Sequence, residues 1–256
     1  PAWSCLLATK ITRRKFVTTF HGTYNFQNKL KKLYNSVMVR SDLVIAGSNF
    51  IFSHINENYG DFFQNNKRKL LVIFRGINTE YFSSKNVSEK MLENQIKEWK
   101  IDKDKFIILL PGRLTNWKGH SVFIEALNIL NQQEGLKPFL AIILGSDQGR
   151  NIYYKKLLSL VERYRLNKKI KFIPNCKEMP VAYKLANVVV SASIEPEAFG
   201  RVSVEAQSMR KPILASEIGG SKETILKDKS GLFFKPGDPI SLAEKLREAL
   251  NLDEVT

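Results

Sequence analysis

Short apolar runs alternate with helical patterns through the second half of the chain. The runs that predict strands are apolar throughout and lie at 106–112, 139–145, 170–174, 188–193, 212–216 and 231–234. Helical spacing of apolar positions follows at 119–131, 152–166, 179–185, 202–209, 221–226 and 239–250. Strands without a polar face, separated by helices, are typical of a parallel sheet covered on both sides. The pattern predicts a doubly wound α/β domain.

The first 85 residues repeat this pattern less completely. Strands are expected at 16–22, 43–48 and 70–76, and helices at about 28–40 and 49–59, with residues 1–10 forming the end of a helix. A polar segment, 83–105, separates the halves and is expected to carry one helix near 91–99. The sequence therefore predicts two domains, a partial α/β domain at 1–85 and a fuller one at 86–256.

Positive charge is concentrated in the first half. The chain has a formal net charge of +15, of which 13 Lys and Arg against 4 Asp and Glu place +9 in residues 1–85. The basic clusters are Arg13-Arg14-Lys15, Lys29 with Lys31 and Lys32, and Lys67-Arg68-Lys69. Three interpretations fit this charge: a face exposed to solvent, a surface that binds an anionic membrane or acidic acceptor, and a surface that binds nucleic acid. No recognised nucleic-acid module accompanies it, so we expect no nucleic-acid partner.

Composition indicates a globular chain from a reducing compartment. Hydrophobic residues make up 43% and charged residues 25%, and no apolar run approaches the ~20 residues that span a bilayer. Basic residues follow rather than precede the short apolar stretch at the start, which does not fit a signal peptide. The two cysteines, Cys5 and Cys176, have neither metal nor disulfide spacing. We expect a cytoplasmic location.

Two cations flank the turn after the first strand of the second half. In the sequence GRLTNWKG, Arg113 and Lys118 lie between Gly112 and Gly119, and a helix follows at once. Backbone amides and the dipole at a helix N-terminus attract a phosphate or diphosphate, and Arg adds forked hydrogen bonds. The loop lacks the P-loop and dinucleotide fingerprints. Surface charges on a turn are the alternative.

Two carboxylates, Glu197 and Glu205, stand eight residues apart, the first in a loop and the second in a helix. Phe199 and Gly200 between them allow the backbone to approach a ligand. A glycosidase pair is disfavoured because nothing places the two across one scissile bond. Each carboxylate instead suits different hydroxyls of one ligand, although Glu205 also fits a solvated helix position. Glu195 is a nearby competitor.

Histidines give a weaker signal. His21 ends an apolar strand before Gly22, where it is either structural or catalytic, whereas His54 and His120 fit structural or surface positions. No set of His, Asp and Cys indicates a metal site.

Together these pieces resemble the retaining glycosyltransferases of family 4, which have two Rossmann-type domains (the GT-B fold). The matching residues are TFHGTY (19–24), VIFRGIN (72–78), GRLTNWKG (112–119), EAFGRVSVEA (197–206) and GGSKET (219–224). The segments PAWS, TTFHGTYNFQNKLKKLYNSVM, PGRLTNWKG and EPEAFGRVSVEAQ resemble more narrowly the lipopolysaccharide-core enzymes of alphaproteobacteria, some of which use GDP-mannose.

The resemblance implies the roles of several residues. Arg113 and Lys118, beside Gly112, would bind the diphosphate of a GDP- or UDP-linked sugar without a metal. Glu205, near Val202, would hold the ribose. Glu197 would contact sugar hydroxyls next to the backbone of Phe199 and Gly200. His21 would lie near the reacting sugar.

The implied function is transfer of a sugar, with mannose a candidate, to lipopolysaccharide core or another lipid-linked glycan. The implied place is the inner face of the inner membrane, as a peripheral protein. Relative to the family, the chain lacks roughly 90 residues at its start and a closing helix after Thr256, so we expect an incomplete N-terminal domain. The rival interpretations are a nucleotide-sugar-binding fragment without activity and a basic nucleic-acid-binding protein.

Overall fold

The computed structural model describes residues 2–24, 28–64, 68–149, 151–227 and 229–251. Lys67 of the third basic cluster and both terminal residues, Pro1 and Thr256, lie outside them. The chain forms two compact units, which we call the N-terminal unit (1–76 and 196–199) and the C-terminal unit (77–195 and 200–256). They divide between Gly76 and Ile77 rather than at residue 85, because Phe82 and Val87 are buried in the core of the C-terminal unit.

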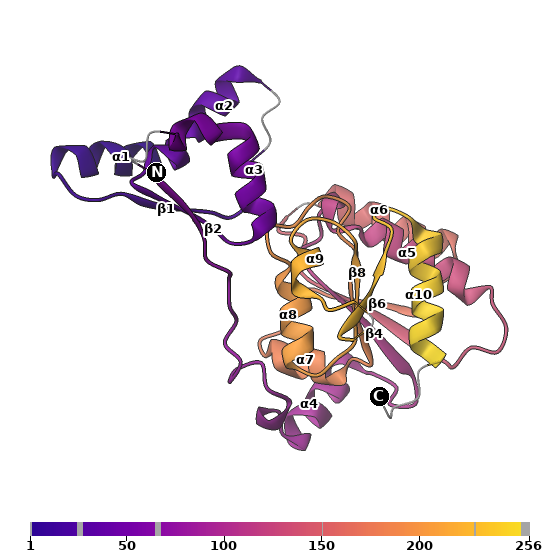
Figure 1. Ribbon diagram of the computed structural model, residues 1–256. Coiled ribbons are helices and arrows are strands. Elements are labelled where there is room, and N and C mark those ends of the chain that lie inside the picture. Colours follow the sequence, from indigo (N-terminus) through magenta and orange to yellow (C-terminus); the bar gives the residue numbers. More distant parts are fainter. Residues whose placement is uncertain (1, 25–27, 65–67, 150, 228, 252–256) are drawn as a thin grey trace. The chain divides into compact units, whose positions relative to one another are not determined.

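The C-terminal unit is built on one six-stranded parallel sheet (Figure 1). Its strands run in the spatial order β6-β5-β4-β7-β8-β9. Their bounds are β4 Phe106–Pro111, β5 Phe139–Leu144, β6 Ile170–Ile173, β7 Val188–Ser191, β8 Ile213–Ser216 and β9 Gly231–Phe234. Each coincides with a predicted apolar run. The register pairs Ile108 of β4 with Ala141 of β5 on one side and with Val188 of β7 on the other.

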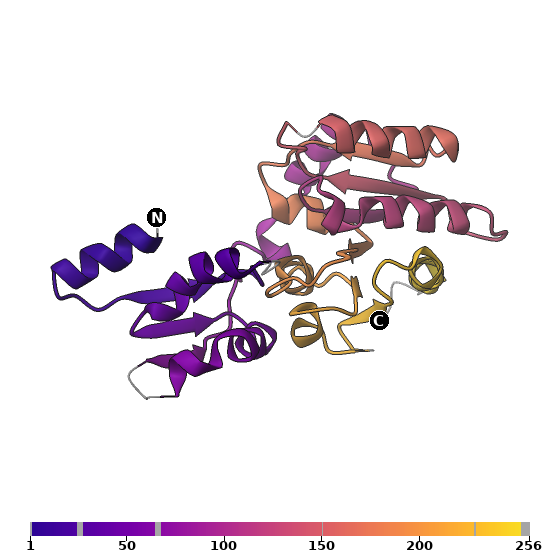
Figure 2. The same ribbon diagram turned by 90° about the horizontal axis from the view of Figure 1, so that it is seen from above.

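Helices cover both faces of this sheet (Figure 2). The helices are α4 Glu89–Trp99, α5 His120–Asn131, α6 Asn151–Arg163, α7 Met179–Leu185, α8 Arg201–Ser208, α9 Ser221–Thr224 and α10 Pro239–Asn251. Alternate residues of β4 point to opposite cores, since Ile108 and Leu110 pack with α5, α6 and α10, whereas Ile107 and Leu109 pack with α4, α7 and α8. Short 3₁₀ helices occupy Ser84–Asn86 and Asn116–Lys118.

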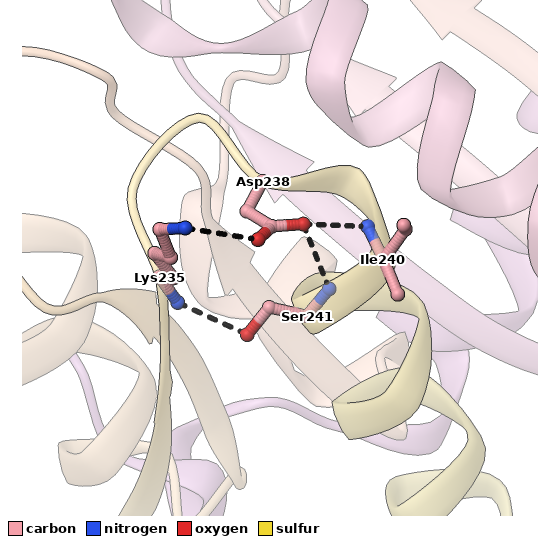
Figure 3. Close-up of polar contacts among 4 residues, drawn as sticks. All are labelled: Lys235, Asp238, Ile240 and Ser241. Carbon is pink, nitrogen blue, oxygen red and sulfur yellow. Dashed lines mark hydrogen bonds and ion pairs between the residues drawn. The ribbon is translucent and has the colours of Figure 1, made fainter.

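A closed set of polar contacts starts α10 (Figure 3). The Asp238 carboxylate accepts hydrogen bonds from the amides of Ile240 at 3.0 Å and Ser241 at 3.1 Å. The Ser241 hydroxyl accepts in turn from the Lys235 amide at 3.1 Å. These amides, that of Ser241 foremost, hold the pKa of Asp238 below its usual value. The helix start is therefore satisfied locally, and α10 packs against α5.

The N-terminal unit has a three-stranded parallel sheet in the order β1-β2-β3. Its elements are α1 Ala2–Ile11, β1 Val17–Phe20, α2 Lys29–Asn35, a 3₁₀ helix Ser36–Arg40, β2 Leu43–Ala46, α3 Asn49–Tyr59, a 3₁₀ helix Gly60–Phe63 and β3 Lys69–Val72. Phe20, Val44, Ile51 and Ile55 form its buried core. Among the residues described, no helix combines the length and apolarity needed to cross a bilayer. The predicted α/β class, with two Rossmann-type units of parallel strands, is confirmed.

Candidate functional site

The order of strands in the C-terminal unit reverses between β4 and β7. The chain builds β5 and β6 outward from one side of β4, then returns to place β7, β8 and β9 on the other. Ligands of doubly wound sheets bind in the crevice outside the carboxyl ends of the strands at this switch point. The loops leaving β4 and β7 are 112–119 and 192–200, which are the two segments that the sequence singles out.

These two loops pack directly on one another. The Ile194 amide donates to the Trp117 carbonyl at 2.8 Å. Gly119 lies so close to the Ala192 carbonyl that a Cβ at this position would be 1.8 Å from its oxygen. The basic turn and the start of the glutamate loop therefore form one continuous structure.

The basic loop positions its two cations differently. Lys118 lays its stem over Gly112, with its Cδ 3.6 Å from where a Cβ of Gly112 would be, and its ammonium is 4.4 Å from the centroid of the Trp117 ring. Arg113 is exposed, while the following amide, of Leu114, is anchored to the Ser146 carbonyl at 3.0 Å. The backbone of the loop is thus fixed, and it presents positive charge where a helix begins.

Glu205 is a buried carboxylate, with only 7% of its surface exposed. The Tyr183 hydroxyl donates to its Oε2 at 2.7 Å, and the Arg201 guanidinium donates to its Oε1 at 2.8 Å. This excludes the alternative of a solvated helix carboxylate. A carboxylate oxygen can accept two hydrogen bonds, so the group keeps capacity for ligand hydroxyls. Removing a carboxylate from water is unfavourable, and the hydrogen bonds from Tyr183 and Arg201 offset this cost.

The neighbours of Glu205 at the start of α8 are placed as follows. Gly200 is buried immediately before the helix, and the half-buried Val202 packs against the core shared with α7. Tyr183 and Arg201, which hold the carboxylate, were not among the predicted site residues. Arg201 stands four residues before Glu205, the spacing of a helical ion pair, and this was a usable signal.

Residues 196–199 belong to the N-terminal unit. The Ser48 hydroxyl donates to the Ala198 carbonyl at 2.5 Å, and Ala198 packs against the core of that unit. On either side of Ala198, Glu197 is half-buried and Phe199 is buried, whereas Glu195 is exposed. The chain passes to the C-terminal unit between Phe199 and Gly200, so the two glutamates belong to different units.

His21 meets an arginine at the carboxyl edge of the N-terminal sheet. Its Nδ1 lies 2.9 Å from Nη2 of Arg75, which follows β3. Arg only donates, so Nδ1 accepts and the proton of the neutral ring is on Nε2. Partial burial, and secondarily the Arg75 charge, lower the pKa of His21. Arg75 was not among the predicted site residues. A signal was present, because the apolar run 70–76 ends in Arg-Gly and the run 16–22 ends in His-Gly.

The predicted residues thus form four local groups. His21 stands with Arg75; Gly112, Arg113 and Lys118 share one loop; Glu197 and Phe199 lie on the segment 196–199; Gly200, Val202 and Glu205 open α8. Over the described parts of the chain, no three His, Cys, Asp or Glu side chains gather as metal ligands would.

Comparisons with known proteins agree with this arrangement. The family model described as "Glycosyl transferases group 1" matches residues 92–255, and the "Glycosyltransferase Family 4" model matches residues 1–81. A crystal structure of a glycosyltransferase from Rickettsia africae ESF-5 is 38% identical, with a TM-score of 0.85, over 97% of this chain and 64% of that one. Anabaena Alr3699/HepE, solved with UDP-glucose, is 23% identical and shares the fold, with a TM-score of 0.84 over 98% of this chain and 66% of that one.

Curated relatives are more distant and longer. The D-inositol 3-phosphate glycosyltransferase of Corynebacterium urealyticum is 28% identical over 221 residues, which cover 85% of this chain and 50% of that protein. The chain therefore spans about half the length of the curated relatives it matches. With the switch-point loops and the group 1 model covering the same unit, the chain belongs to the group 1 glycosyltransferase family.

Proposed function

We propose that the C-terminal unit binds a nucleotide-sugar at the crevice between the loops after β4 and β7. The observation that carries this is the switch point itself, where a fixed basic loop and a helix with a buried carboxylate leave neighbouring strands. Arg113 and Lys118 would hold the diphosphate, and Glu205 the ribose hydroxyls. The backbone at Gly200 and Val202, which opens α8, would face the phosphates.

Sugar transfer would draw on the remaining predicted residues. Glu197, beside the backbone of Phe199, would accept hydrogen bonds from sugar hydroxyls, and His21, oriented by Arg75, would act near the reacting carbon. The cations at the diphosphate would stabilise the departing charge. On this proposal the donor binds without a divalent metal, and transfer retains the configuration at the sugar.

Arg113→Ala should weaken binding of UDP or GDP by about 1.5–3 kcal/mol, the range for a hydrogen bond to a charged group. Isothermal titration against a panel of UDP- and GDP-sugars, UDP-glucose included, measures this and identifies the base. Arg247→Ala, which removes an exposed cation from α10, is the matched control and should leave affinity unchanged. Wild-type affinity should survive EDTA. Strict dependence of binding on Mg²⁺ or Mn²⁺, or equal losses in the two variants, would count against the proposal.

The two glutamates should separate ribose from sugar recognition. Glu205→Gln should weaken free nucleotide and nucleotide-sugar alike by roughly tenfold or more, since it removes a charged acceptor. Glu197→Gln should spare free nucleotide and weaken only the nucleotide-sugar. Titrating each variant with both ligands gives the comparison, and circular dichroism checks folding. Equal losses for the free nucleotide would refute this division of roles.

For the acceptor we propose lipopolysaccharide core or another lipid-linked glycan, with mannose a candidate sugar. The support is the sequence resemblance, together with the basic N-terminal unit, where α2 alternates Lys29, Lys31 and Lys32 with exposed Leu30 and Leu33. Such a surface suits the anionic cytoplasmic face of a membrane. The alternative is a chain that binds donor but does not transfer sugar. A transfer assay with purified core acceptor decides, because turnover at ~1 s⁻¹, within the ordinary enzyme range, would exclude the binding-only alternative.

A further inference from the structure

A basic cavity of about 350 Å³ lies in the N-terminal unit, at the amino ends of its strands. Five cations line it, together with Asp42: Lys10, Arg13, Arg14, Arg40 and Arg68. We call this the amino-end pocket. His21 and Arg75 leave the opposite, carboxyl ends of β1 and β3, so the pocket is not part of the site described above.

The carboxylate in the pocket is already engaged. Asp42 accepts from the Phe16 amide at 2.9 Å, and its other oxygen is 3.3 Å from the ammonium of Lys15. Within the described parts of the chain, none of the five cations forms an ion pair. The pocket therefore gathers positive charge that the protein does not neutralise.

Two of the arginines are held in place by aromatic rings. The guanidinium carbons of Arg40 and Arg68 lie 5.5 and 5.9 Å from the centroid of the same ring, Phe62, and that of Arg40 is also 5.7 Å from the Trp3 ring. Arg40 donates through Nε to the Ser36 hydroxyl at 3.2 Å. Stacking of this kind orients the guanidinium while its terminal amino groups stay available for a ligand.

An ordinary structural role explains only part of this cluster. Lys10, Arg13 and Arg14 stand at the C-terminal end of α1, where positive charge complements the helix dipole. Arg40 ends the short 3₁₀ helix Ser36–Arg40 and Arg68 precedes β3, so no single helix dipole explains why these two reach the same cavity from separate elements. Their convergence with the first three on one cavity places like charges together, which is unfavourable unless an anion binds among them.

We propose that the amino-end pocket binds a phosphate group. Paired guanidinium forks match the oxygens of a phosphate, and flanking lysine adds charge without a fixed geometry. The phosphate belongs either to a small soluble molecule or to the headgroup of an anionic lipid. This site goes beyond donor binding, because it lies within the N-terminal unit and uses none of the donor residues.

The test compares two double variants that remove the same charge. Lys10→Gln/Arg14→Gln strips the pocket, and Lys155→Gln/Lys156→Gln removes two exposed lysines of α6, which does not line it. Both are made in the Arg113→Ala background, so that the donor loop contributes little. In titrations with inorganic pyrophosphate, the pocket variant should bind at least about tenfold more weakly, whereas the α6 variant should change less than about twofold. A parallel measurement compares melting temperature in phosphate and in chloride of equal ionic strength, and the rise in phosphate should vanish only in the pocket variant.

Vesicles distinguish the two sources of the phosphate. Sedimentation is measured with phosphatidylcholine vesicles containing or lacking phosphatidic acid. If pyrophosphate binding depends on Lys10 and Arg14, the ligand is a soluble phosphate. If binding to phosphatidic-acid vesicles depends on Lys10 and Arg14, the ligand is a lipid headgroup. If neither ligand separates the pocket variant from the α6 variant, the proposal is wrong, and donor titrations with Arg113 intact remain a separate test of the donor site.

Discussion

Replacing Gly119 with Ala should lower the free energy of unfolding by about 2–5 kcal/mol and abolish nucleotide binding. Gly119 has φ +69°, and its Cβ would lie 1.8 Å from the Ala192 carbonyl oxygen. A left-handed residue with a side chain costs about 1–2 kcal/mol, and overpacking adds about 1–3 kcal/mol. Because the clash is with backbone, the loops after β4 and β7 must separate. Urea unfolding and nucleotide titration measure both effects.

Two other glycines act as controls for the separate causes. Gly135 also has a left-handed φ, +75°, but nothing lies within 4 Å of its Cβ position, so Gly135→Ala should cost only about 1–2 kcal/mol. Gly145 has no such φ, yet its Cβ would be 2.0 Å from the Gly112 carbonyl oxygen. Gly145→Ala should therefore disturb the basic loop through contact alone. If Gly119→Ala were no less stable than Gly135→Ala, the close packing of the two loops would be refuted.

Much of the fold could be predicted because each strand of the C-terminal unit is buried on both faces. Runs such as FIILLP at β4 carry no polar face, so their limits follow from the sequence. The helix expected at about 49–59 matches α3, which Ser48 caps by accepting from the Ile51 amide at 3.1 Å. Strand limits and helix starts depend on residues that are close in the sequence, so the sequence alone can indicate them.

One predicted helix divides where the local signals conflict. Residues 28–40 form α2 and then a 3₁₀ helix beginning at Ser36. The Ser36 hydroxyl donates to the Leu33 carbonyl at 2.7 Å, which competes with the helical ladder. Val37 and Val39 beyond it are buried. Burial of β-branched side chains then favours the tighter turn over a continuous α-helix.

The site was less predictable because its contacts join distant segments. Tyr183 precedes Glu205 by 22 residues, and Arg75 follows His21 by 54. Neither pair has a spacing that marks it in one sequence. The assignment of residues 196–199 to the N-terminal unit likewise depends on Ser48, which is 150 residues from Ala198. Single motifs predicted loops that follow β4 and β7, but which side chains contact the predicted residues depends on how the strands are ordered.

Acid should weaken the C-terminal unit through one histidine. His120 is the first residue of α5 and is fully buried, with its ring edge-on to Tyr153 at 6.0 Å between centroids. Burial, opposed in part by the nearby backbone of Thr115 and Gly112, lowers its pKa from 6.5 to about 4. An imidazolium here would also face the positive end of the helix dipole. The folded state therefore keeps His120 neutral.

The sign of the pH dependence follows from this. Between pH 6.5 and about 4 the unfolded chain binds a proton at His120 that the folded chain excludes, so stability falls as pH falls through this window and levels off below it. The full difference is about 3 kcal/mol. His120→Phe keeps an aromatic ring but cannot titrate. Between pH 7.5 and pH 4 the urea midpoint of the wild type should therefore fall by more than that of His120→Phe. Parallel profiles for the two proteins would show that another group governs acid sensitivity.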